Sequence, residues 1–78
     1  MPRYFFDFQD TGVSASDPEG TECKDLEEAK REAVVALLEM TAELPRGYVH
    51  RELTITVRDE DGRNLVQAVI TFEVRVLD

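Results

Sequence analysis

The chain has no tryptophan, one cysteine and one histidine among its 78 residues. A single cysteine, Cys23, excludes an internal disulfide and is typical of a protein kept in a reducing compartment. No apolar run approaches the roughly 20 residues that a membrane-spanning helix needs. The amino terminus also lacks the basic stretch, apolar run and small-residue cleavage site of a signal peptide. We therefore expect one soluble, cytoplasmic domain spanning residues 1–78.

Basic side chains are scarce as well. Nine lysines and arginines stand against 17 acidic residues, for a net charge of −8. The acidic excess is concentrated in residues 1–44, which carry eleven acidic and four basic side chains. Nucleic acids and anionic membranes both attract cationic side chains, so an acidic chain suits neither. We expect an unidentified protein partner or self-association instead, with no nucleic acid and no membrane.

The amino-terminal stretch predicts strands on either side of a turn. Residues 3–9 alternate, so one face of this strand is aromatic. Pro at the second and Gly at the fourth position of residues 17–20 are typical of a type I turn. A short strand over residues 21–23 can then pair back on the first, and residues 13–16 are ambiguous between a loop and the start of that returning strand. The aromatic face consists of Tyr4, Phe6 and Phe8, opposite Phe5, Asp7 and Gln9.

A helix is predicted to begin after Asp25. The Asp25 carboxylate can accept from the N–H three residues later, and Glu28 stands where a capping box needs its acid. One apolar stripe then recurs at three- and four-residue spacing, and Pro45 and Gly47 end the helix near residue 43 or 44. The stripe consists of Leu26, Ala29, Ala33, Ala36, Leu37, Met40 and Leu44.

The second half of the chain predicts a hairpin. Residues 52–58 alternate apolar and polar side chains, residues 59–62 form a turn, and a last strand runs from about residue 64 to 77. The element order ββαββ predicts an α+β fold, an antiparallel sheet of three to four strands with one helix packed on one face. Parallel strands remain an alternative for the pair that the helix connects.

The last strand is longer than the helix that should cover it. A helix of about 18 residues measures about 27 Å, whereas a strand over residues 65–77 measures about 43 Å. Either the strand bends or bulges, or its apolar end at Val74 and Val76 packs against another surface. The second alternative predicts a homo-oligomer, since small domains often complete their core by association.

Four stretches of the sequence are similar to a known family. They are Met1-Pro2-Arg3-Tyr4-Phe5-Phe6, Asp17-Pro18-Glu19-Gly20-Thr21-Glu22, Asp25-Leu26-Glu27-Glu28-Ala29 with Ala33, and a V-x-D-x-x-G-R hairpin at residues 57–63. Together they resemble a domain-of-unknown-function family of small bacterial proteins, frequent in rhizobia and related soil bacteria. Family members often carry His where Phe6 or Asp7 stands, so any role of that His is absent here. The resemblance implies no activity, ligand or catalytic residue, because the family has none established.

Residue types that carry chemistry do not converge in this sequence. His50 stands alone before a strand, whereas a zinc site or a hydrolytic triad needs several converging groups. Cys23 lies near the helix start, but neighbouring acids oppose thiolate formation, so a buried small side chain is favoured. Asp59, Asp61 and Asn64 resemble a calcium loop only superficially, because Gly62 stands fourth instead of sixth and the twelfth position is Ile70 instead of an acid. We therefore predict no metal site, no cofactor and no catalytic residues.

The predicted function is a non-catalytic interaction or regulatory module rather than an enzyme, since so small a domain encloses catalytic pockets poorly. The candidate partner surface is the back of the sheet and the end of the last strand, formed by Phe5, Tyr48, Val69, Val74 and Val76. The alternative is a small-molecule-binding homo-oligomer, because a helix on long antiparallel strands is similar in outline to the flavin-storing dodecins. Two features depart from dodecins: this chain has no Trp to stack a flavin, and dodecins have one strand before the helix.

Overall fold

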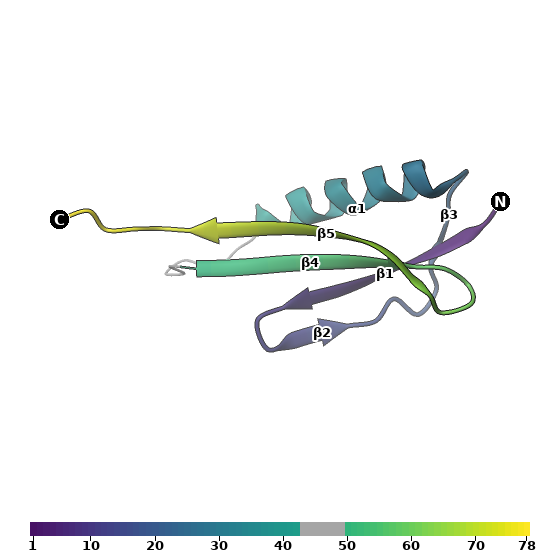
Figure 1. Ribbon diagram of the computed structural model, residues 1–78, viewed down its shortest axis with the longest axis horizontal. Coiled ribbons are helices and arrows are strands. Elements are labelled where there is room, and N and C mark those ends of the chain that lie inside the picture. Colours follow the sequence, from purple (N-terminus) through teal and green to yellow (C-terminus); the bar gives the residue numbers. More distant parts are fainter. Residues whose placement is uncertain (43–49) are drawn as a thin grey trace.

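A computed structural model describes residues 1–42 and 50–78. Four strands form a sheet in the order β2-β1-β4-β5, and a fifth, β3, also pairs with β1. The strands are β1 (Arg3–Asp10), β2 (Val13–Ala15), β3 (Thr21–Glu22), β4 (His50–Arg58) and β5 (Asn64–Glu73), and the helix is α1 (Leu26–Thr41). The helix lies along the strands on the β5 side of the sheet (Figure 1). The predicted α+β fold, with one helix on an antiparallel sheet, is confirmed.

The returning strand of the first half is split in two, which accounts for the fifth strand. β2 pairs with residues 8–10 of β1, and β3 pairs with Arg3 and Tyr4 farther along the same strand. The helix therefore connects β3 to β4, two strands that run in the same direction with β1 between them. Every strand pairing in the described residues is antiparallel, so the alternative of a parallel pair around the helix is not realised.

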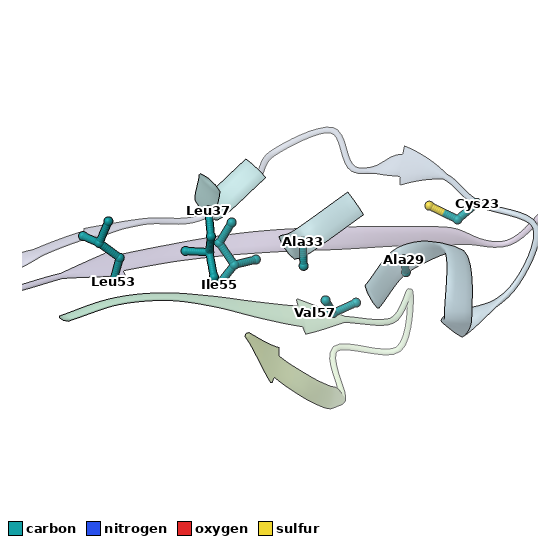
Figure 2. Close-up of a cluster of buried hydrophobic side chains, with 7 residues drawn as sticks. All are labelled: Cys23, Ala29, Ala33, Leu37, Leu53, Ile55 and Val57. Carbon is teal, nitrogen blue, oxygen red and sulfur yellow. The ribbon is translucent and has the colours of Figure 1, made fainter. Parts of the chain in front are cut away.

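The core forms where the apolar stripe of α1 packs on the sheet. α1 approaches β4 and β5 about equally closely and β1 much less. The buried apolar side chains, drawn in Figure 2, are those of Cys23, Ala29, Ala33, Leu37, Leu53, Ile55 and Val57. Half-buried side chains of β1 and β5 surround them, including the three aromatics predicted for the inner face. The predicted faces of helix and strands are thus confirmed for the described residues, while Leu44 lies outside them.

The helix begins as predicted, with one difference in its capping box. Asp25 is the N-cap, and its Oδ1 accepts from the Glu28 N–H at 2.9 Å. Glu28 reaches back to the N–H of Lys24, at 2.9 Å, instead of the N–H of the cap residue itself. The first contact satisfies an N–H group that a helix start leaves without a partner in the helix, and the second ties the residue before the cap to the first turn.

Two predicted element ends differ from the observed ones. α1 ends at Thr41, and the predicted stop signals near residues 43–49 lie outside the described residues. β5 ends at Glu73 and not at residue 77, and Glu73 pairs with His50, the first residue of β4. The alternative that the last strand bulges is realised at Leu65, where the β4–β5 register shifts by one residue.

Candidate functional site

The break between β2 and β3 is held by the carboxylate of Asp17. Its Oδ2 accepts from the Phe6 N–H at 3.1 Å, in place of a backbone carbonyl of a neighbouring strand. Its Oδ1 accepts from the N–H groups of Glu19 (3.3 Å) and Gly20 (3.1 Å). The predicted turn therefore exists, but the side chain of Asp17 closes it where a type I turn would use the backbone carbonyl.

Arg58 ties the same loop to the back face of the sheet. Its Nε donates to Asp7 Oδ2 at 2.8 Å, and its Nη2 donates to Asp7 Oδ1 at 3.2 Å and to the Asp17 carbonyl at 3.4 Å. Asp7 Oδ1 also accepts from the Asp17 N–H at 3.0 Å. The guanidinium lies over the ring of Phe5, 4.6 Å from its centroid. Phe5 is consequently half-buried beneath Arg58 and serves as its packing surface.

A second ion pair, between Arg51 and Asp10, lies on the helix-covered face. The guanidinium contacts both carboxylate oxygens, and the two side chains are only 12% and 7% exposed. Sequence reasoning missed this pair and the Asp7–Arg58 pair. The signal for the buried pair is that Asp10 and Arg51 each occupy an inner-face position of a strand, where apolar residues otherwise alternate.

These ion pairs predict how stability depends on pH. Arg58 lowers the pKa of Asp7 mainly by hydrogen bonding, against an opposing effect of burial, and Arg51 lowers the pKa of Asp10 in the same way. A depressed folded-state pKa contributes stability that is complete above the unfolded pKa, about 3.9, and is lost as the pH falls through the folded value. We expect urea midpoints to fall below about pH 4. The decline should be smaller in Asp7→Asn, and equal slopes in both proteins would contradict this account.

The four described residues of the predicted partner surface do not lie together. Phe5 and Val69 share the back face, but their neighbours on β4, Arg58 and Thr54, stand about 13 Å apart along the strand. The other three predicted residues are Val74 and Val76, both exposed past the end of β5, and Tyr48, which lies outside the described residues. In Figure 1 the chain end carrying the two valines extends beyond the sheet.

A different apolar surface lies on the helix-covered face, at the β5 edge. The side of α1 next to β5 exposes 49% of Val34 and 56% of Leu38. Two adjoining hollows of about 270 and 310 Å³ lie between helix and strand, and Val34 and Ala68 line both. We call this surface the α1–β5 groove and define it by Val34, Leu38, Val66, Ala68 and Ile70. The sequence contains a signal for this groove. Val34 and Leu38 are apolar but lie beside the stripe that packs on the sheet, so the apolar side of the helix is wider than the sheet can cover.

The groove borders a strand edge without a neighbour. β5 is ten residues long and pairs with β4 on one side, and no other strand of the described residues pairs with it. A long open edge presents unpaired N–H and C=O groups and is a template for pairing with another chain. Side-chain and main-chain contacts are therefore both available at this edge of the molecule.

The remaining candidate side chains are each buried, paired with a neighbour or part of a turn. Cys23 is 1% exposed, and burial, reinforced by nearby acids, raises the pKa of its thiol, which agrees with the predicted buried side chain. His50 is exposed, with Nδ1 3.7 Å from a Glu73 carboxylate oxygen. Asp59 Oδ1 accepts from the N–H groups of Asp61 and Arg63, each at 2.9 Å, and closes the hairpin turn.

No three metal-ligating side chains cluster in the described residues, and the helix in them is too short and polar to cross a membrane.

Comparison with known proteins shows to which family the chain belongs. A family model described as a domain of unknown function, DUF6894, matches residues 3–72, which include α1 and nearly all of the sheet. No curated protein and no solved structure matches the chain significantly. The resemblance to a domain-of-unknown-function family is thus confirmed, whereas the bacterial origin stays a prediction. The chain belongs to the DUF6894 family.

Proposed function

We propose that this protein is a non-catalytic interaction module that acts through the α1–β5 groove and the open edge of β5. The observation that supports it best is the position of the exposed Val34 and Leu38 directly beside an unpaired ten-residue strand edge. An exposed apolar patch is typical of an interaction site, and an open strand edge adds main-chain hydrogen bonds to a partner strand. The proposal places the module in a bacterial cytoplasm, in keeping with its family resemblance and its single thiol.

The roles of the charged side chains favour binding over catalysis. Asp7 and Arg58 join the back of the sheet to the loop before β3, and Asp10 and Arg51 join β1 to β4. Asp17 supplies hydrogen bonds that the interrupted strand lacks. These side chains are occupied in holding the fold, so their environment is explained without a substrate. The interaction surface is correspondingly apolar.

Site-specific photo-cross-linking in living cells tests the proposal. A photoreactive phenylalanine analogue replaces Val34 in one variant and Val35 in the other. The two valines are equally exposed, at 49% each, but Val35 lies about 100° further round the helix and outside the groove. We expect a discrete protein adduct, either to another protein or to a second copy, from position 34 and not from position 35. Absence of adducts at position 34, or the same adducts from both positions, would refute the proposal.

A further inference from the structure

We propose that the occupant of the α1–β5 groove is a second copy of this chain. β5 of each copy pairs antiparallel with β5 of the other, about a two-fold axis at Ala68. The product is one continuous sheet with the order β2-β1-β4-β5-β5-β4-β1-β2 and both helices on one face. This inference rests on the proposed function, since it names the partner of the same surface.

The backbone of β5 is oriented for such a pairing. Phe6 donates its N–H to Asp17, away from β4, and main-chain groups alternate in direction along each strand. The main-chain N–H and C=O groups of Phe6 and Phe8 therefore point away from β4. Ile55 stands opposite Phe8, so its main-chain groups point to β5. Those of its β5 partner, Ala68, point back to β4. The residues on either side of Ala68 then direct their N–H and C=O groups to the open edge.

With the axis at Ala68, these open-edge groups meet as a matched pair. Gln67 of one copy stands opposite Val69 of the other, so the two residues can exchange both of their hydrogen bonds. Ala68 stands opposite Ala68 at the closer spacing of a non-hydrogen-bonded pair, about 4.5 Å between Cα atoms. A small side chain suits this position, because it lies on the face that both helices cover.

The position of the helix fits the same axis. α1 lies over β4 and β5, so its axis stands about 5 Å from the midline of a β5–β5 pair, given a strand spacing of about 4.8 Å. The two helices are then about 10 Å apart, which is a normal distance for packed helices. Val34 and Leu38, exposed in one copy, face their counterparts along this helix–helix contact. The second copy thus covers both the strand edge and the groove.

Charged residues at the two ends of β5 complement each other in this register. Arg63 and Glu73 lie five residues on either side of Ala68, so each arginine comes level with the glutamate of the other copy. The bulge at Leu65 places Asn64 on the back face with Arg58, so Arg63, which lies just before β5, starts on the opposite face from Glu73. The arginine side chain therefore reaches the glutamate of the other copy around the end of the strand. Opposite charges on paired strands stabilise the pairing, and like charges oppose it.

Sedimentation equilibrium of the purified chain across a wide concentration range tests the inference. We expect the wild type to approach twice the chain mass of 8.9 kDa. The double variant Val34→Lys/Leu38→Lys should be monomeric, because four lysines would meet between the helices, while Val35→Lys should remain dimeric. Far-UV circular dichroism checks that each variant keeps its fold. A monomeric wild type, or a folded double variant that dimerises normally, would overturn the inference.

Two further variants test the pairing itself. Val69→Pro removes an open-edge N–H without removing a β4–β5 hydrogen bond, and it should abolish the dimer. Arg63→Glu and Glu73→Arg should each weaken dimerisation by about tenfold, and the two together should restore it. Loss without restoration in the double variant would overturn the register about Ala68.

The outcomes also separate this inference from the proposed function. A monomeric chain whose position 34 cross-links to a different protein overturns the second copy as occupant and leaves the interaction module standing. A monomeric chain that gives no adduct at position 34 overturns both. An adduct between two copies supports both.

Discussion

Leu37→Ala should lower the free energy of unfolding by about 2–5 kcal/mol. Leu37 is 3% exposed and belongs to the same buried cluster as Ile55 (Figure 2). The other buried side chains that α1 contributes are those of Ala29 and Ala33, so Leu37 supplies the largest buried side chain on this helix. Its truncation removes apolar burial and leaves a cavity that the sheet cannot close, because β4 is held by strands on both sides. A domain has only about 5–15 kcal/mol of stability in total, so the loss would be a large share.

Urea denaturation at one fixed protein concentration measures this effect. The concentration is held constant so that the variants are compared under the same conditions for the proposed association, which makes apparent stability depend on concentration. Val35→Ala is the matched control, since Val35 lies on the same helix but is 49% exposed, and it should change the unfolding free energy by less than about 0.5 kcal/mol. Equal losses from the two substitutions would mean that α1 packs on the sheet through another face.

Gly20→Ala should cost about 2–5 kcal/mol, for two separate reasons. Gly20 has a φ of +71°, in the left-handed region where a residue with a Cβ is disfavoured by about 1–2 kcal/mol. An added Cβ would also stand 2.9 Å from the carbonyl oxygen of Tyr4 and equally close to atoms of Arg3 and Phe5. Relief of that contact requires the loop to move away from β1, at about 1–3 kcal/mol.

Gly12→Ala separates the two contributions. Gly12 has nearly the same φ, +73°, but nothing stands within 4 Å of an added Cβ. Its substitution should therefore cost only the conformational part, about 1–2 kcal/mol. The difference between the two variants in urea denaturation measures how tightly the loop before β3 packs on β1. Equal losses would contradict the close approach of Gly20 to Tyr4.

The elements of this fold were predictable because their signals are local. Alternation along β4 and the three- and four-residue spacing along α1 each identify a buried face from neighbouring residues alone. The capping residues Asp25 and Glu28 mark the helix start for the same reason. Local patterns do not specify which strands become neighbours in the sheet. The position of β1 between β3 and β4 could therefore not be derived from them.

The proposed interaction surface was harder to predict than the fold. The sequence predicts that Asp17 begins a turn. It does not indicate that the Asp17 carboxylate accepts the hydrogen bond of the Phe6 N–H, because that contact joins residues eleven positions apart. The predicted partner surface comprises the back of the sheet and the end of the last strand, and its Phe5 is half-buried under Arg58. Val34 and Leu38 become informative only once the side of α1 that borders the open edge is known.

The strand order also constrains how the chain can fold as it leaves the ribosome. β1 is made first, yet it gains its β4 neighbour only after residues such as Arg58 have emerged, 51 positions after Asp7. Closing so long a loop is slow compared with forming the β4–β5 hairpin. Until then, β2 and β3 are the strands available to shield one edge of the aromatic β1. We therefore expect early pairing of these short strands to shield this edge of β1 from other chains.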